Sequence, residues 1–186
     1  MDIASVEGLT GLSLARIAGQ LGLSKSGVSG HFASQTALQL AIVARAAHQY
    51  VERIVLPAWE TAAGIDRVRS FCWLWLAFMT DSVLAGKCFF LTAMVEFDAR
   101  SGPLRNELAR LRQDWGTLFA GAVREAQRLG EVRTDVDADQ VFFDVFAWIA
   151  AAVVDSQLLG DLTAFERARQ SIDGRLDSIR TTAPDA

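Results

Sequence analysis

The sequence predicts an all-α fold, and three observations predict it. Apolar residues recur at intervals of three and four along most of the chain, which is the spacing of one face of a helix. No segment shows the strict alternation of apolar and polar residues that is typical of a strand. The composition, with 51% hydrophobic and 22% charged residues and only 3 prolines, suits a packed helical chain. The 186 residues fit one domain, or a small module joined to a medium one.

Capping residues mark the first helices. Ser13 is expected to N-cap a helix over residues 14–21, and Gly22 is expected to end that helix in a left-handed conformation. Ser24 then caps a short second helix that runs to about Phe32.

Longer helices follow. Ser34 caps a third helix, which Pro57 is expected to kink or interrupt because proline lacks the helical N–H donor. Further helices are expected over residues 65–85, 88–97, 104–129, 137–159 and 162–180. The tail 181–186 is expected to be frayed.

The sequence predicts a cytoplasmic protein without a membrane partner. The best apolar run, residues 70–80, falls short of the roughly 20 residues that a spanning helix needs. Asp2 and Glu7 stand where a signal peptide would carry basic residues. Two cysteines form no disulfide framework, so a reducing compartment is expected.

No cofactor, metal or catalytic centre is expected. Cys72 and Cys88 lie among apolar residues, which raise a thiol pKa, so buried structural cysteines are favoured over a redox pair. His31 and His48 have no cysteine or acidic neighbours at the spacing of zinc ligands.

The charge is unevenly distributed. The net charge is −4, yet residues 8–51 contain no Asp or Glu and carry Arg16, Lys25 and Arg45. An acid-free N-terminal segment joined to an acidic body leaves nucleic-acid binding open without establishing it.

Two short helices joined by a tight glycine turn form a helix-turn-helix pattern. Ala18 is small where the second helix must cross closely, and Gly22 permits the sharp turn. Ile17, Leu23 and Val28 are expected to form the small core between the helices. The same pattern also occurs in helical bundles that do not bind DNA.

The second helix is expected to face a DNA groove. Lys25 can contact a phosphate or a guanine, and Ser26, Gly27 and Ser29 are small enough to let the backbone approach closely. Ser13, at a helix N-terminus, can present backbone N–H groups to a phosphate.

The stretch 11–40 resembles the DNA-binding region of the tetracycline-repressor-like (TetR) family of one-component regulators. The residues that carry this resemblance are Ser13, Ile17-Ala18, Leu21-Gly22-Leu23-Ser24, Lys25, His31-Phe32, Ser34 and Leu38. A later stretch, 89–108, resembles one common C-terminal subtype of the family through Glu96-Phe97-Asp98 and Gly102-Pro103.

The resemblance implies two domains with different functions. Residues 1–50 would be the DNA-binding domain and residues 51–180 a regulatory and dimerisation domain. The protein would bind a palindromic operator as a homodimer and act as a repressor that a small apolar or aromatic effector releases. His31 and Gln35 would join Ser13 in contacting phosphates.

The chain departs from the family pattern at three places. Ser29 stands where the family usually has Tyr, and Gln35 stands where it usually has Lys. Each replacement removes a side chain that contacts a phosphate in the family. Only residues 2–7 precede Gly8, so most of the family's first helix is expected to be missing, through a truncation or a misplaced start.

A cluster of aromatic and sulfur-containing residues provides candidates for an apolar effector pocket, although such residues are more often plain core. The candidates are Phe71, Trp75, Phe78, Met79, Phe90 and Met94. Glu96 and Asp98 are expected to serve as a cap or as ion-pair partners of Arg100 or Arg105, in preference to acid–base or metal chemistry.

Two later helices carry apolar stripes that suit a dimer, with one stripe per helix facing the core. The stripes are Trp115, Leu118, Phe119 and Ala122 on one helix, and Phe142, Phe146, Ile149 and Val153 on the other. An alanine-rich surface suits close packing across a two-fold axis and consists of Ala147, Ala150, Ala151 and Val154.

Two other classes of protein compete with the regulator. An all-α enzyme or ligand carrier has little support, because no nucleophile with a matched base and no phosphate loop is present. A dimeric helical protein that binds a small molecule and has lost DNA binding through its shortened N-terminus stays open.

Overall fold

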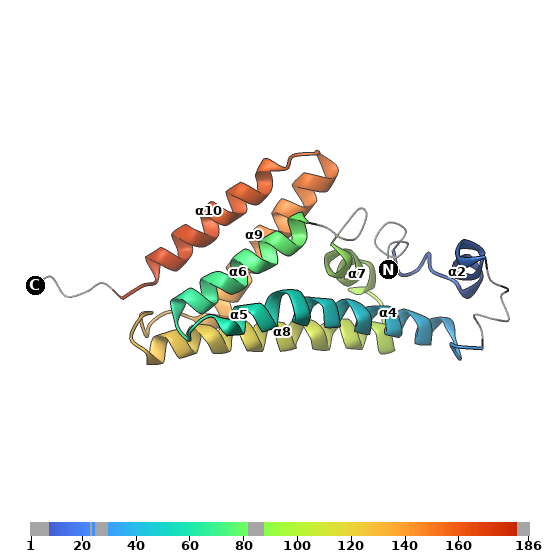
Figure 1. Cartoon of the computed structure of the whole chain (residues 1–186), viewed down its shortest axis with the longest axis horizontal. Helices are drawn as coiled ribbons and strands as arrows, with labels where there is room; N and C mark the ends of the chain where they lie inside the picture. Colours follow the sequence, from blue (N-terminus) through green and yellow to red (C-terminus); the bar gives the residue numbers. More distant parts are fainter. Residues whose placement is uncertain (1–7, 23, 25–29, 82–87, 182–186) are drawn as a thin grey trace, which may run out of the picture. The chain divides into compact units, whose positions relative to one another are not determined.

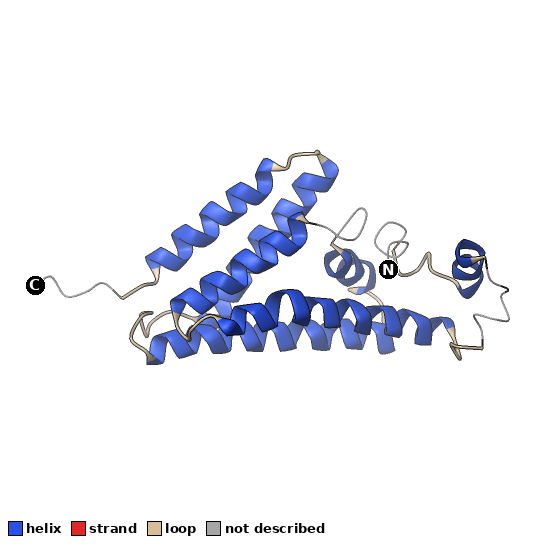
Figure 2. Ribbon diagram, viewed as in Figure 1, coloured by secondary structure: helices blue, strands red, loops and turns tan. Residues whose placement is uncertain are grey.

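The computed structural model of the chain describes residues 8–22, 24, 30–81 and 88–181 (Figure 1). Within those ranges the regular secondary structure is helical, which confirms the all-α prediction (Figure 2). One isolated antiparallel bridge joins Val132 to Arg180.

The chain forms two compact units. The first contains Met1–Gln49 and Ser82–Arg112, and the second contains Tyr50–Asp81 and Gln113–Ala186. Each unit is therefore built from two separate stretches of sequence.

In the first unit, helix α2 spans Leu14–Leu21, as predicted. The Ser13 hydroxyl oxygen accepts a hydrogen bond of 3.1 Å from the Arg16 N–H, which satisfies a donor that the helix cannot pair internally. Gly22 ends the helix at φ 64°, a left-handed conformation that favours glycine. Most of the predicted second helix, residues 25–29, lies outside the described residues.

The other helices of the first unit surround a small apolar core. Helix α4 (Gln35–Tyr50) begins after Ser34, whose hydroxyl oxygen accepts from the Ala37 N–H at 3.1 Å. Helix α7 (Phe89–Phe97) and the beginning of helix α8 (Pro103–Arg128) complete the unit. The buried apolar side chains include Leu9, Leu12, Ala18, Leu38, Val43, Phe90, Leu104 and Leu108.

The α-helical pattern breaks just before Pro57, in line with the predicted kink or interruption, but the backbone stays helical through a π turn. A π-helical segment, η1 (Val51–Val55), joins α4 to helix α5 (Leu56–Glu60), and the Leu56 N–H donates to the carbonyl of Val51. Pro57 therefore falls in the first turn of α5, where a missing N–H donor is tolerated. A new α-helix begins after the wider π turn, and Pro57 therefore lies in the first turn of that helix.

The second unit packs helix α6 (Ile65–Thr80) against α9 (Ala138–Leu158) and α10 (Thr163–Ser178), with α9 and α10 lying side by side (Figure 1). Asp137 caps α9 by accepting from two N–H groups of its first turn. Helix α6 ends at Thr80, five residues before the predicted end at residue 85.

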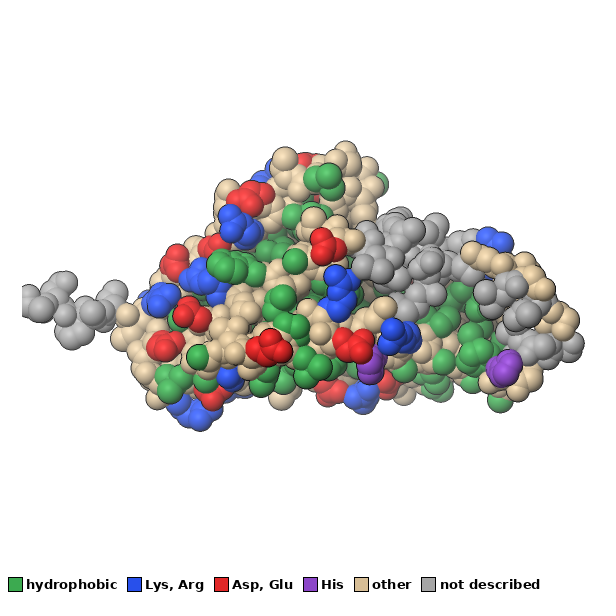
Figure 3. All heavy atoms as spheres, in the orientation of Figure 1, with side chains coloured by type: hydrophobic (Ala, Val, Ile, Leu, Met, Phe, Trp, Pro, Cys, Tyr) green, Lys and Arg blue, Asp and Glu red, His purple; other side chains and the backbone are tan. Residues whose placement is uncertain are grey.

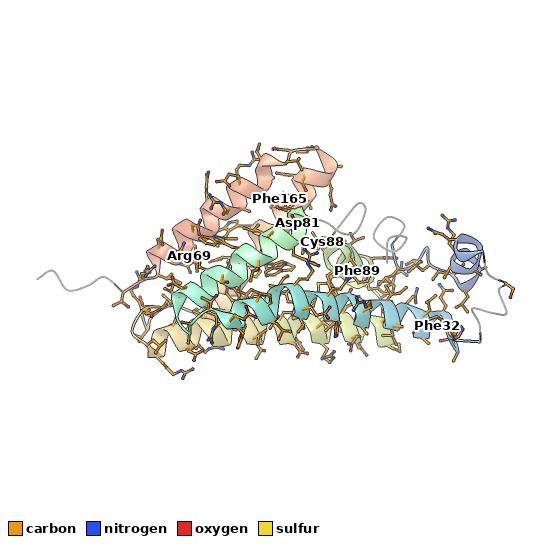
Figure 4. The ribbon with its side chains drawn as sticks, viewed as in Figure 1. Phe32, Arg69, Asp81, Cys88, Phe89 and Phe165 are labelled. Atoms are coloured by element: carbon orange, nitrogen blue, oxygen red, sulfur yellow. The ribbon has the colours of Figure 1, made fainter. Side chains whose placement is uncertain are left out.

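Ion pairs join the helices of the second unit. Arg69, which Figure 4 labels, contacts two carboxylates of α10 from α6: Asp173 at 2.8 Å and Asp177 at 2.6 Å. Arg175 pairs with Asp144 at 3.0 Å and so joins α10 to α9. Where Figure 3 colours the side chains, acidic and basic groups are intermixed on the visible face.

Helix α9 differs from the expectation that no apolar run is long enough to span a bilayer. Among the described helices, α9 alone is long and apolar enough by length and composition to do so. Its buried positions, which include Val141, Val145 and Ile149, pack in the core of the second unit. The apolar composition therefore fits a core helix that also has an apolar exposed face.

Candidate nucleic-acid interface and effector site

The first helix of the helix-turn-helix pattern is present with the predicted geometry. Ser13 uses its hydroxyl to cap α2, so its contribution to a phosphate site would come from the backbone N–H groups of the first turn. His31 and Gln35, two further predicted phosphate contacts, are exposed. The predicted groove residues Lys25, Ser26, Gly27 and Ser29 lie outside the described residues.

A tight anchor holds the segment that leads into α2. The Leu9 N–H donates to Glu96 Oε2 at 2.8 Å, and the Leu9 carbonyl accepts from Gln39 Nε2 at 2.7 Å. The Leu9 side chain is buried, so its peptide groups need these partners. The backbone of Leu9 is thus hydrogen-bonded to α7 through Glu96 and to α4 through Gln39.

Glu96 makes further contacts in this anchor. Its Oε1 accepts from the Thr10 N–H at 2.7 Å and also from the Thr10 hydroxyl. Gly8 lies beneath the same carboxylate at φ 74°, and a Cβ built there would lie 2.8 Å from Glu96 Oε2. The left-handed backbone conformation favours glycine at this position, and any larger residue would also push the Glu96 carboxylate aside.

The role of Glu96 only partly follows the sequence prediction. A capping role was expected, but Glu96 caps a segment that lies 86 residues away in sequence, and does not act through a local pair with Arg100 or Arg105. The sequence near Glu96 does not predict these hydrogen bonds, because the neighbours of a helical carboxylate do not indicate which distant backbone groups it will contact.

The aromatic cluster of the second unit is a packed core. Phe71 and Trp75 are only 1% and 5% exposed. The Phe71 ring centroid lies 5.4 Å from that of Phe119 and 6.3 Å from that of Tyr50, in edge-to-face arrangements. Trp75 stacks on Phe142 at 6.2 Å. These geometries are typical of core packing.

The structure does not bring the six predicted effector residues together within one unit. Phe71, Trp75, Phe78 and Met79 belong to the second unit, whereas Phe90 and Met94 belong to the first. Phe78 is half-buried, and the guanidinium carbon of Arg53 lies 5.1 Å from its ring centroid. Phe90 is buried and its ring packs edge-to-face on that of Phe89, at 5.1 Å.

Each unit has an open groove on its surface. In the second unit the groove runs along α6 and is lined by Thr61, Asp66, Arg69, Ser70, Trp73, Leu74 and Ala77. Trp73 is 43% exposed, and its Nε1 donates to Asp173 at 3.2 Å. The groove of the first unit lies between α7 and α8 and includes Met94. Of the six predicted effector residues, Met94 alone lines one of these two grooves.

The prediction of buried cysteines is confirmed for Cys72, whereas Cys88 is half-buried. Both are free thiols; Cys72 is fully buried, and burial raises the pKa of the Cys72 thiol and of the Cys88 thiol. Such thiols are poor nucleophiles at neutral pH. Among the residues that the structure describes, no group of three His, Cys, Asp or Glu side chains is placed to hold a metal ion.

Comparison with known proteins defines the class. A family model described as "Tetracyclin repressor-like, C-terminal domain" matches residues 64–172. The comparison with curated proteins finds no match.

Solved structures of regulators share the fold. A TetR transcriptional regulator from Chloroflexus aurantiacus is 25% identical, with 97% of this chain and 92% of that chain covered and a TM-score of 0.89. A regulator from Saccharomonospora viridis, solved with choline, is 20% identical over 97% and 93% of the two chains, with a TM-score of 0.78. AibR, solved with isovaleryl coenzyme A and operator DNA, is 19% identical over 92% and 89%, with a TM-score of 0.71.

The helix-turn-helix start and the helical body thus define a transcriptional regulator. The chain belongs to the TetR family of transcriptional regulators, as the resemblance over residues 11–40 predicted. The family consists of regulators and not of enzymes, which agrees with the expectation of no catalytic centre.

Proposed function

We propose that this protein is a one-component, ligand-responsive repressor that acts in the cytoplasm as a homodimer. It binds a palindromic operator and is released by a small apolar or aromatic effector. The observation that carries the proposal is the α2 unit, with its Ser13 cap and left-handed Gly22, in a chain of the TetR family. In this division residues 1–50 bind DNA and residues 51–180 bind the effector and form the dimer.

The DNA-binding residues follow from the helix-turn-helix arrangement. Lys25 contacts a base edge or a phosphate, and Ser26, Gly27 and Ser29 line the groove. Ser13, His31 and Gln35 contact phosphates, and the exposure of the last two supports that role. Ser29 and Gln35 replace stronger phosphate contacts of the family, so the affinity is weak and falls steeply with salt.

The exposed face of α9 supports a dimer. Phe143 is 60% exposed and Leu158 is 77% exposed, and between them Ala147, Ala151 and Val154 are also exposed at helical spacing. This stripe contains three of the four residues predicted to pack across a two-fold axis, and a soluble monomer rarely exposes so continuous an apolar stripe. The other predicted stripes are mostly buried in the core, as at Phe119, Phe142 and Ile149, whereas Leu118 and Phe146 are half-buried.

The effector is expected to be small and mainly apolar or aromatic. The chain is rich in aromatic side chains at α6 and α7, and Phe78, Met79 and Met94 are only half-buried there. Relatives of the same fold have been solved with choline and with isovaleryl coenzyme A, so the fold accommodates small ligands of several kinds. Binding lowers operator affinity if it favours a conformation in which the recognition helices no longer fit the DNA.

A mobility-shift experiment with DNA flanking the protein's own gene tests the proposal. The wild-type protein is expected to shift a palindrome at low salt. Lys25→Ala should weaken binding by about 1–3 kcal/mol and unevenly across operator variants if Lys25 reads a base, or uniformly if it contacts a phosphate. Arg128→Ala, which removes an exposed charge at the end of α8, is the matched control and should bind as wild type.

Failure of that experiment has a clear meaning. If the protein shifts no palindrome near its gene even at low salt, the repressor proposal is wrong. The alternative, a dimeric helical protein that binds a small molecule without binding DNA, then takes its place.

A further inference from the structure

The groove of the first unit is formed by facing turns of α7 and α8. From α7 and its C-cap it takes Met94, Phe97 and Asp98, which share a face at spacings of three and four. From α8 it takes residues at spacings of three, four and seven, namely Arg105, Leu108, Ala109 and Arg112. Its volume is about 240 Å³.

The groove combines an apolar floor with a basic rim. Leu108 is buried, and Met94 and Phe97 are half-buried, so the floor is hydrocarbon, aromatic ring and thioether. Arg105 and Arg112 stand on the α8 side. A third guanidinium belongs to Arg100, and its central carbon lies 4.8 Å from the Phe97 ring centroid.

Charge decides what kind of ligand fits. Asp98 is the one acidic side chain that lines the groove, against Arg105 and Arg112 on the lining and Arg100 beside it. The local charge is therefore positive in a protein whose net charge is −4. Guanidinium groups pair with carboxylates through two parallel hydrogen bonds, and the apolar floor favours a hydrocarbon body.

We propose that this groove binds a small amphipathic organic anion, a short apolar chain or ring that ends in a carboxylate. Drug-sized ligands occupy pockets of about 300–1,000 Å³, so a groove of about 240 Å³ calls for a smaller molecule. The inference rests on the proposed function, since it narrows the apolar effector to one that carries a negative charge.

The position of the groove couples ligand binding to the DNA-binding segment through α7. Helix α7 presents Met94 and Phe97 to the groove and, from the intervening position Glu96, holds the N–H groups of Leu9 and Thr10. A ligand that shifts or rotates this short helix also moves the carboxylate that anchors the segment before α2.

Isothermal titration calorimetry of the whole protein tests the site with octanoate as the probe and octanol as its uncharged counterpart. Octanoate is expected to bind, and octanol to bind about tenfold more weakly, because octanol lacks the charge that Arg105 recognises. Arg105→Gln should weaken octanoate binding about five- to tenfold, since the guanidinium is exposed and solvent screens part of the interaction. Arg110→Gln is the control, because Arg110 lies on the same helix but pairs with Glu107 outside the groove lining.

The outcomes separate cleanly. Weaker octanoate binding in Arg105→Gln, with wild-type binding in Arg110→Gln, supports the proposal. The proposal is overturned if octanoate does not bind, if both variants lose the same affinity for octanoate, or if octanol binds as tightly as octanoate. It is also overturned if octanoate binding is lost at high protein concentration, because a second copy of the protein would then cover the groove. Calorimetry uses no DNA, so a failure of operator binding would count against the proposed function alone.

Discussion

Glu96→Ala removes the carboxylate that anchors the segment before α2. Glu96 accepts from the backbone N–H groups of Leu9 and Thr10 and from the Thr10 hydroxyl. A hydrogen bond to a charged acceptor contributes about 1.5–3 kcal/mol when it is shielded from water. The Leu9 bond is partly buried and the Thr10 bonds are exposed, so we expect a total loss of about 2 kcal/mol.

The loss can be measured by urea unfolding and by amide hydrogen exchange. For a chain of this length a loss of about 2 kcal/mol lowers the melting temperature by roughly 4–8 °C. The Leu9 amide should exchange much faster in Glu96→Ala, because its acceptor is gone. Glu96→Gln keeps an acceptor oxygen and should recover part of the loss.

Asp98→Ala is the matched control, because it removes an exposed carboxylate two residues further along. Its free energy of unfolding should stay within about 0.5 kcal/mol of the wild type. If Glu96→Ala and Asp98→Ala unfold at the same urea concentration, and the Leu9 amide exchanges at the wild-type rate in both, the anchor contributes nothing and the reasoning fails.

Three further predictions follow from the second unit. Arg69→Ala should cost about 1–3 kcal/mol in urea unfolding, because it leaves the partly buried Asp173 without that cation, whereas Arg169→Ala breaks an exposed pair and should change stability by less than about 0.5 kcal/mol. Burial raises the pKa of Cys72, so only the unfolded thiol ionises above a pH of about 8.5, and the free energy of unfolding should fall by up to about 1.4 kcal/mol per pH unit above that. Cys72→Ala should make this fall shallower, because the Cys88 thiol, whose pKa burial also raises, contributes the remainder. A fall of equal slope in both proteins would assign it to groups other than Cys72. Phe143→Glu should convert the dimer to a monomer in light scattering while Arg169→Ala stays dimeric; a wild-type protein of monomeric mass at micromolar concentration would remove the basis for the stripe on α9.

Local signals in the sequence predicted the helix boundaries well. Ser13 and Gly22 bracket α2 as predicted, because capping depends on residues within one turn of the helix end. The helix expected over residues 137–159 is α9, Ala138–Leu158. At Pro57 the missing donor predicted a disturbed helix, but the sequence did not show that the disturbance takes the form of a π turn.

The site was harder to predict than the helices. Helical periodicity places Phe71 and Trp75 on apolar faces, but it cannot distinguish a packed core from the lining of a pocket. The same pattern selected Met94, which lines the groove of the first unit beside Phe97 and Asp98. The groove residues on α8 include arginines that look like ordinary surface charges in the sequence. The Glu96 anchor depends on a pairing across 86 residues, which only the folded chain reveals.

The most direct test of the account varies the spacing of the operator half-sites. In a dimer whose recognition helices lie about 34–36 Å apart, half-sites one helical turn apart should bind. Insertion of 5 base pairs between them, about half a turn, moves one half-site to the other side of the duplex. Fluorescence anisotropy should then show the affinity falling to that of a scrambled duplex. Equal affinity for the two spacings would contradict the claim that this chain reads DNA as a two-fold dimer.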